Sequence, residues 1–351
     1  MSLSYKIYPY NLQFAFEAGT SRGVLNEKKS WFIKLYDLQN PNVFGLGEVS
    51  VIQKLSIDSE LITVELIAQQ LDIFIANDFN LASISVQFPA IKFGIETAYL
   101  DFINGGKRIL FNNEFSQGKS GIEINGLIWM GDKQLMLKRI GEKLEEGYTC
   151  LKLKIGAINF QDELDLLKNI RNQFSAKELT VRVDANGAFS ASKALGKLNQ
   201  LAEYHIHSIE QPIAVGQFEA MAELCKKSPI PIVLDEELIG IFGAENKINL
   251  LKTIQPPYII LKPSLVGGFV ECLEWINIAE SLDIQWWITS ALESNIGLNA
   301  IAQFTAGFNN PLPQGLGTGQ LYTNNILSPL EINKGYLFSN SLNYWDLSLF
   351  Q

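Results

Sequence analysis

Between residues 123 and 289, short apolar runs alternate with longer segments of helical periodicity, and no other feature constrains the fold as strongly. The runs that predict strands are 123–130, 150–155, 180–184, 207–210, 232–235, 258–261 and 284–289. Segments with apolar residues at three and four spacing lie between most of these runs and predict helices, including 133–146, 159–174 and 191–204. Strands that alternate with helices in this way are parallel. Seven or eight such units favour a closed barrel over an open sheet.

The N-terminal part of the chain has a different pattern. Residues 5–53 contain alternating apolar and polar runs separated by turn residues, which predict a small antiparallel sheet. Two helical patterns follow at 62–77 and 89–104, and the polar stretch 112–121 predicts a linker. The sequence therefore predicts an α+β unit in front of the barrel.

Two further segments carry expectations of their own. The loop Gly19–Gly23 is rich in small residues around Arg22, and both a mobile lid and an ordinary turn are compatible with it. After Leu321 the chain becomes polar and aromatic, and we expect this tail to pack back against the N-terminal unit.

Composition excludes several classes of protein. The chain has 351 residues and a net charge of −9, with basic residues scattered along it, which argues against nucleic acid as a partner. Its three cysteines are far apart and form no CxxC pair, which argues against a disulfide framework and a thiolate metal site. Neither a long apolar segment nor a signal-peptide pattern appears, so we expect a cytoplasmic protein that binds no membrane. No dinucleotide or phosphate-cradling loop is present, so we expect no nucleotide cofactor. The expected partner is a small molecule, and the oligomeric state stays open.

Charged residues close five successive strands of the predicted barrel. They are Lys152 and Lys154, Asp184, Glu210, Asp235 and Lys262. Their spacings, 184 − 154 = 30, 210 − 184 = 26, 235 − 210 = 25 and 262 − 235 = 27, each approximate one strand–helix unit. Alternation within 151–155 alone leaves open whether the two lysines face solvent or a pocket. Because reactive groups of parallel barrels lie at the carboxyl ends of the strands, the regular spacing favours the pocket.

This set of residues indicates a particular chemistry. Three carboxylates without histidine or cysteine form an all-oxygen site, which suits Mg²⁺. Lys154 and Lys262 would flank the ion from opposite sides of the barrel, and Lys152 would be the cation beside Lys154. A lysine base next to a divalent ion fits removal of a proton α to a carboxylate.

The motifs that contain these residues resemble the muconate-lactonizing branch of the enolase superfamily. They are Lys152-Leu153-Lys154, Val183-Asp184-Ala185-Asn186-Gly187, Glu210-Gln211-Pro212, Asp235-Glu236-Glu237 and Lys262-Pro263. Within that branch, the stretches 262–268, 290–297 and 315–319 are similar to those of the o-succinylbenzoate synthases. The resemblance implies a modified (β/α)7β TIM barrel at 116–319 and an α+β capping domain at 1–115 that is completed by 320–351.

The same resemblance implies roles for individual residues. The implied reaction is the Mg²⁺-dependent dehydration of 2-succinyl-6-hydroxy-2,4-cyclohexadiene-1-carboxylate to o-succinylbenzoate, a step of menaquinone biosynthesis. Lys154 would remove the α-proton, Lys262 would hold the enolate by its charge, and Lys152 would assist Lys154. The Mg²⁺ ligands would be Asp184, Glu210 and Asp235. The implied substrate-binding residues are Arg182, Asn186, Ser264, Ser290, Thr318 and Arg22, the last of which is equally compatible with an ordinary surface arginine.

Two alternatives stay open. An N-succinylamino acid racemase or a dipeptide epimerase of the same superfamily would use the same two lysines, one on each face of the substrate. Dipeptide epimerases usually carry an Asp-x-Asp pair near the last strand, whereas residues 312–319 contain no carboxylate. A barrel that binds a ligand without catalysis is the other alternative, and the six filled positions argue against it.

Overall fold

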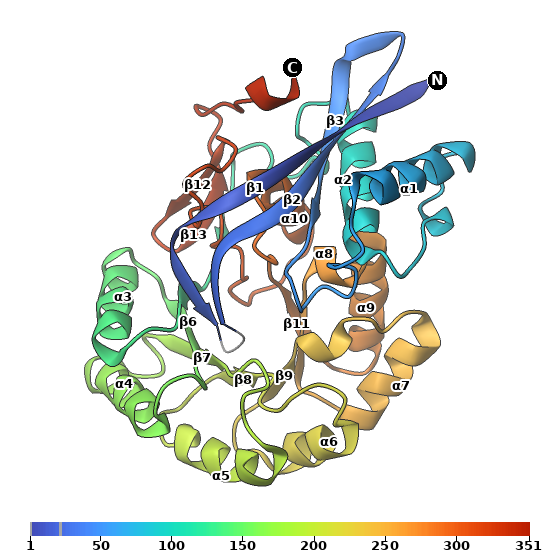
Figure 1. Ribbon diagram of the computed structural model, residues 1–351. Coiled ribbons are helices and arrows are strands. Elements are labelled where there is room, and N and C mark those ends of the chain that lie inside the picture. The colour runs from blue at the N-terminus through green and yellow to red at the C-terminus, as the bar shows by residue number, and fades with distance from the viewer. Residues whose placement is uncertain (1, 21–22) are drawn as a thin grey trace.

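The computed structural model describes residues 2–20 and 23–351. A barrel of parallel strands carries an N-terminal sheet and two helices across one of its ends, and the C-terminal segment returns beside that sheet (Figure 1). We call residues 2–20 and 23–103 the cap. Within the part of the chain described here, no helix has the length and apolar character that crossing a membrane would require.

Seven parallel strands form the barrel, in the order β11-β10-β9-β8-β7-β6-β5. Their bounds are β5 Gly126–Ile128, β6 Cys150–Lys154, β7 Thr180–Asp184, β8 Ser208–Glu210, β9 Ile232–Leu234, β10 Tyr258–Leu261 and β11 Gln285–Ile288. The edges meet through two isolated bridges, since Gly315 bridges Thr289 after β11 and Gln314 bridges Ile124 before β5. A Cβ atom at Gly315 would lie 2.3 Å from Oγ1 of Thr289, so this approach requires glycine. The predicted barrel is confirmed, with these bridges in place of a regular last strand.

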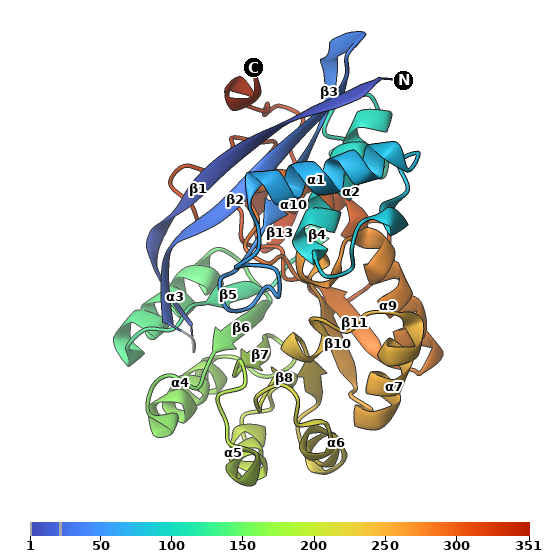
Figure 2. The same ribbon diagram turned by 45° about the vertical axis from the view of Figure 1, so that its right-hand side comes forward.

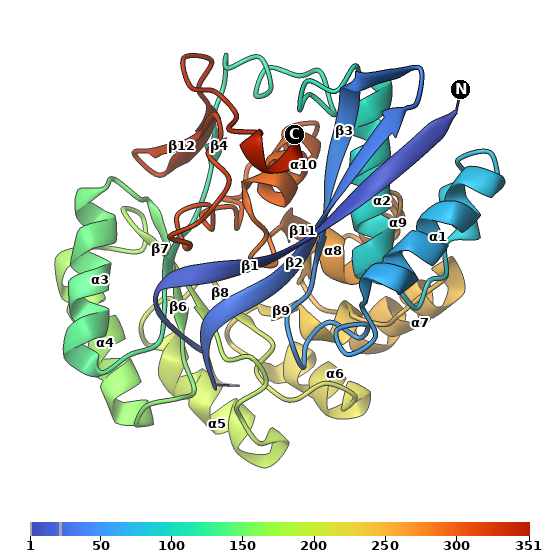
Figure 3. The ribbon, with the colours of Figure 1, turned by 45° about the horizontal axis from the view of Figure 1, so that its top comes forward.

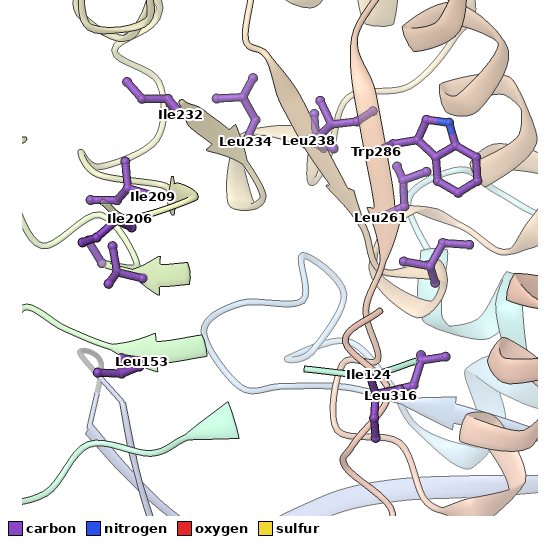
Figure 4. Packing of buried hydrophobic residues seen from close by; sticks show 14 of the residues in the cluster. Ile124, Leu153, Ile206, Ile209, Ile232, Leu234, Leu238, Leu261, Trp286 and Leu316 are labelled. Atoms are coloured by element: carbon purple, nitrogen blue, oxygen red, sulfur yellow. The ribbon is translucent and has the colours of Figure 1, made fainter. Parts of the chain in front are cut away.

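Helices lie around the outside of the barrel (Figure 2). They are α3 Lys133–Glu145, α4 Phe160–Gln173, α5 Ala191–Ala202, α6 Phe218–Lys227, α7 Ala244–Ile254, α9 Phe269–Ser281 and α10 Asn295–Thr305, with short α8 Pro263–Val266 and the 3₁₀ turn η2 Glu236–Leu238. Leu151 and Leu153 of β6 belong to the large apolar cluster between strands and helices, part of which Figure 4 shows. Each such buried leucine contributes roughly 1.5–3 kcal/mol to folding. Because side chains alternate along a strand, burial of these leucines turns Lys152 and Lys154 into the barrel.

The stretch 123–130, which predicts one strand, forms two short strands with different partners. β4 (Ile122–Glu123) pairs with the C-terminal strand β13 (Tyr336–Ser339), whereas β5 pairs with β6 in the barrel. The backbone N–H of Ile124 donates to Gly335, and that of Asn125 donates to Gln314. The prediction of a single strand is therefore wrong, because the chain changes hydrogen-bonding partner between these two residues.

The cap is an antiparallel sheet followed by two helices, as predicted. The sheet has the order β1-β2-β3, and the elements are β1 Leu3–Thr20, β2 Gly23–Asp37, β3 Asn40–Ser50, α1 Val64–Ala76, η1 Leu81–Ser83 and α2 Pro89–Ile103. Strand β3 packs against the backbone of α2 at Gly45 and Gly47. A Cβ atom would lie 2.0 Å from the carbonyl oxygen of Ala98 at the first position and 1.9 Å from that of Gly94 at the second. These two glycines therefore set how closely sheet and helix approach.

The C-terminal segment lies against the cap sheet. It contains β12 Leu330–Asn333, β13 and the 3₁₀ turn η3 Ser348–Phe350. Tyr10 donates from its hydroxyl to the carbonyl oxygen of Asn324 at 2.7 Å, and Lys34 Nζ donates to that of Phe350 at 2.6 Å. The ring of Phe350 is buried and packs edge-on against Phe32. Both ends of the chain therefore contribute to one layer above the barrel, while the boundaries at 115 and 320 stay predictions.

Candidate active site

A cavity of about 230 Å³ lies at the carboxyl ends of the barrel strands, where the β1–β2 hairpin of the cap reaches over the barrel (Figure 3). Its walls come from residues 23–25 and 52–55 of the cap and, in the barrel, from strand-end lysines and the loops at 289–292 and 315–318. The cap and the barrel thus enclose it together.

The two lysines of β6 enter this cavity side by side. Lys154 Nζ lies 2.6 Å from Asp184 Oδ2, and Lys152 Nζ lies 3.0 Å from the same oxygen. Lys154 also donates to Oδ1 of Asn186 at 2.9 Å. Strand alternation explains why both ammonium groups share one partner on the neighbouring strand β7.

Three carboxylates stand beside the lysines, at the ends of β7, β8 and β9. Parallel pairing aligns Asp184 with Glu210, and Asp235 directly follows β9. Each is 2% exposed or less. Glu210 contacts Lys152, and Asp235 contacts Lys262. The spacing of one strand–helix unit per charged residue therefore gathers five strand ends at one floor, where the lysines line the cavity and the carboxylates lie directly behind them.

The proton affinities of these groups follow from burial and from their neighbours. Burial by itself would raise the pKa of Asp184, but the ammonium groups of Lys152 and Lys154 hold it below its usual value. Burial would lower the pKa of Lys152, but the surrounding carboxylates raise it, so this side chain stays protonated. Burial raises the pKa of Glu210 well above its usual value, and the negative charges of Asp184 and Asp235 add to the effect.

The donor set fits a hard divalent cation. Among residues 2–20 and 23–351, no three carboxylate, histidine or cysteine side chains are arranged as a ready coordination group, and lysine ammonium groups lie against the carboxylates. Oε1 of Glu210 is nevertheless buried without a hydrogen-bond donor. A buried carboxylate with a raised pKa between two other carboxylates is a place where added positive charge is stabilised. Three oxygen-only side chains suit Mg²⁺ in particular.

Three of the predicted substrate-binding residues line the cavity. Asn186 lies against Lys154, and its Nδ2 donates to Oε1 of Glu236 at 2.9 Å. The hydroxyls of Ser290 and Thr318 are 2.5 Å apart on the opposite wall. The structure therefore brings these residues together with the lysines, as the motifs predict.

Two other predicted residues are not among those that line the cavity, and their contact with a substrate stays a prediction. Arg182 precedes Asp184 by one alternation, which places it deeper in the barrel. Its guanidinium stacks over the ring of Trp287 at 4.0 Å and donates to the carbonyl oxygen of Pro313. Ser264 is fully buried in α8, where its hydroxyl donates to Glu293 at 2.5 Å. Arg22 lies outside the described residues.

Some cavity residues were not predicted from the sequence. Glu236 lines the cavity and directly follows Asp235. It belongs to the motif Asp235-Glu236-Glu237, but the spacing of the strand ends selected only Asp235. Lys54 lies in the cap segment 52–55, where no motif points to it. Lys54 reaches the cavity only because the cap docks on the barrel, and a local sequence pattern does not predict that docking.

Comparisons with known proteins agree with this geometry. Residues 136–340 match the family described as "Enolase C-terminal domain-like". Over 372 aligned positions, which cover 96% of this chain and 98% of the relative, the chain is 47% identical to the o-succinylbenzoate synthase of Desulfotalea psychrophila. The chain belongs to the o-succinylbenzoate synthase family of the enolase superfamily. The resemblance drawn from the five motifs is thus confirmed.

Solved structures support the membership. The crystal structure of MenC from Desulfotalea psychrophila is 43% identical, covers 96% of this chain and 99% of that one, and has a TM-score of 0.80. The muconate lactonizing enzyme of Pseudomonas fluorescens, complexed with muconolactone, has a TM-score of 0.81 at 22% identity, over 99% of this chain and 98% of that one. The second likeness shows that the o-succinylbenzoate synthase family shares its fold with muconate-lactonizing enzymes.

Proposed function

We propose that the protein is a carbon–oxygen lyase that dehydrates 2-succinyl-6-hydroxy-2,4-cyclohexadiene-1-carboxylate to o-succinylbenzoate in menaquinone biosynthesis. One observation carries the proposal. Lys154 and Lys262 contact buried carboxylates at the ends of strands β7 and β9, with Glu210 between those carboxylates, on the floor of one cavity. This arrangement supports a base and a cation on two sides of a substrate carboxylate.

Lys154 is the proposed base. Its Nζ is held by Asp184 at 2.6 Å and by Asn186 at 2.9 Å, which fixes its direction at the cavity floor. In its neutral form it takes the proton from the ring carbon that bears the carboxylate. The resulting ammonium then gives a proton to the departing hydroxyl on the same face, so one water leaves and the ring becomes aromatic.

Lys262 is the proposed partner for the negative charge that develops on the substrate carboxylate. Burial opposes its charge, but the carboxylates of Asp235 and Glu210 raise its pKa, so it remains an ammonium group. A fixed cation in a water-poor cavity stabilises developing negative charge more than water would.

Asp184, Glu210 and Asp235 would hold Mg²⁺. When bound, the ion supplies positive charge to the carboxylate oxygens of the substrate as they become more negative. A divalent ion held by the three carboxylates would add two positive charges beside the ammonium groups of Lys152 and Lys262. The carboxylates of the substrate complement this added positive charge.

The remaining residues have proposed roles that follow their places. Asn186, Ser290 and Thr318 would contact the substrate, because they line the cavity. The cytoplasmic location and the absence of nucleic-acid and membrane partners stay predictions, and so does the contact of Arg22 with the succinyl group.

A racemase or epimerase of the same superfamily is the alternative to test. The wall around Gly315, Gly317 and Thr318 belongs to the carboxylate-free segment 312–319. A dipeptide substrate carries an ammonium group, and this wall has no carboxylate to pair with it.

The test is to incubate the protein and Mg²⁺ with the cyclohexadiene and to follow the aromatic product by absorbance. A parallel panel of N-succinylamino acids and dipeptides in D₂O reports exchange at the α-carbon. Formation of o-succinylbenzoate supports the proposal. Exchange in the panel without product from the cyclohexadiene contradicts it and identifies the alternative.

A further inference from the structure

One carboxylate of the cap binds the N-terminus of a barrel helix. Glu48, at the end of β3, is fully buried, and its Oε2 accepts hydrogen bonds from the backbone N–H groups of Ser294 at 3.0 Å and Gly297 at 3.1 Å. The Ser294 hydroxyl donates to the same oxygen at 2.6 Å, and Ser30 donates to Oε1 at 2.8 Å. The first N–H groups of a helix need acceptors, and a carboxylate there is favoured by the helix dipole. Helix α10 is thus capped by a residue of the cap.

The segment that precedes α10 is a wall of the cavity and has an unusual backbone. Residues 290–292 line the cavity, and Leu292 has a φ of 63°, a left-handed conformation that non-glycine residues rarely adopt. Tyr322 donates from its hydroxyl to the Leu292 carbonyl oxygen at 2.6 Å, and Oε2 of Glu293 accepts from the N–H of Ala291 at 2.7 Å. A strained backbone persists only where its surroundings hold it.

A buried lysine of the cap lies beside Glu48. Lys28 Nζ lies 4.0 Å from Oε1 of Glu48 and contacts the hydroxyl of Ser50. All three residues belong to cap strands, while the groups that Glu48 holds belong to the barrel. The cap therefore presents a carboxylate with a lysine beside it to the end of the cavity wall.

We propose that Glu48 is a positioning residue for the substrate cavity: through the N-terminus of α10 it fixes the wall at 290–292, so that docking of the cap sets substrate affinity. This inference rests on the proposed function for its substrate. Among residues 2–20 and 23–351, no hydrogen bond or ion pair joins Glu48 to the lysines or carboxylates of the floor, so it acts on binding and leaves the proton-transfer groups unchanged.

The chain offers a matched control in Glu96 of α2. Its Oε2 accepts from the N–H of Phe269 at 2.5 Å and its Oε1 from that of Val270 at 3.2 Å, at the start of α9. It is also a buried cap carboxylate on a barrel helix, 3% exposed. The residues before α9, Gly267 and Gly268, are not among the cavity-lining residues. Loss of this contact removes a cap–barrel bond of the same kind without touching the wall.

The experiment compares Glu48→Gln and Glu96→Gln by steady-state kinetics with the cyclohexadiene and Mg²⁺. In Glu48→Gln, a side-chain NH₂ group replaces one carboxylate oxygen. It cannot accept the hydrogen bonds that Ser294 and Gly297 donate to Glu48 in the unmodified protein. We expect KM to rise roughly tenfold or more in Glu48→Gln with kcat within about threefold and an unchanged pH profile, and KM to be unaltered in Glu96→Gln. Equal kinetic effects of the two variants would overturn the inference.

Amide hydrogen exchange gives a second result that does not depend on turnover. Exchange should accelerate at 290–297 in Glu48→Gln and at 267–272 in Glu96→Gln. Unchanged protection at 290–297 in folded Glu48→Gln overturns the positioning role, whereas absence of turnover in the unmodified protein overturns only the proposed function. If Glu48→Gln does not fold, Ser294→Ala replaces it, because this change removes one donor to Glu48. The same comparison of KM and of hydrogen exchange at 290–297 then decides.

Discussion

Glu96 makes stability depend on pH in a direction that can be calculated. Burial raises the pKa of this carboxyl to about 7 from a usual 4.5, against the opposing effect of the N–H groups of Phe269 and Val270. Between these values the folded chain binds a proton that the unfolded chain has lost, so folding stability is present below about pH 4.5 and falls as the pH rises through about 7. The difference, 7 − 4.5 = 2.5, corresponds to roughly 3 kcal/mol of unfolding free energy.

The perturbation is Glu96→Gln, and the assay is urea unfolding of both proteins at several pH values from about 5 to 8. The glutamine cannot titrate, so the unmodified protein should lose roughly 2–3 kcal/mol relative to the variant across this range. Taking the difference between the two proteins removes the titrations of groups that do not interact with Glu96. A difference in unfolding free energy that stays constant with pH would refute the reasoning.

Three further predictions concern the floor and the buried lysine of the cap. Lys262→Met should lower kcat of the folded variant by about a hundredfold or more, since it removes the cation beside the developing charge; a near-normal kcat would contradict its role. Glu210→Gln should weaken Mg²⁺ binding, measured by isothermal titration calorimetry, by about tenfold or more; undiminished affinity would remove Glu210 from the ligand set. Lys28→Met should lower the unfolding free energy by roughly 3–5 kcal/mol, because Glu48 and Glu293 would keep buried charge without their cation; a urea midpoint equal to that of the unmodified protein would show that the lysine is dispensable.

The floor of the site could be predicted from the sequence because a periodic fold places it. In a parallel barrel each strand contributes its last residues to the same end, so the spacing between Lys154, Asp184, Glu210 and Asp235 carries three-dimensional information. Leu151 and Leu153 define the opposite face of β6, which fixes the direction of the lysines. The barrel was predictable for the same reason.

The cap side of the cavity and the depth of individual barrel residues could not be predicted, because they depend on contacts between distant segments. Lys54 reaches the cavity only through docking of the cap, and Ser264 turns toward Glu293 because that carboxylate lies beside it in the folded chain. Arg182 shares the inward face of β7 with Asp184, and its depth below the floor depends on how Trp287 fills the barrel interior. Alternation along a strand predicts which side chains point into the barrel. It does not predict how far along the barrel axis each side chain lies from the cavity.

The measurement that tests the central claim most directly compares the unmodified protein with Lys154→Ala in the dehydration assay with Mg²⁺. We predict that the unmodified protein converts the cyclohexadiene to o-succinylbenzoate and that Lys154→Ala, although folded, is slower by about 10³-fold or more. Near-normal turnover by Lys154→Ala, or no aromatic product from the unmodified protein, would contradict the assignment of Lys154 as the base of a dehydratase.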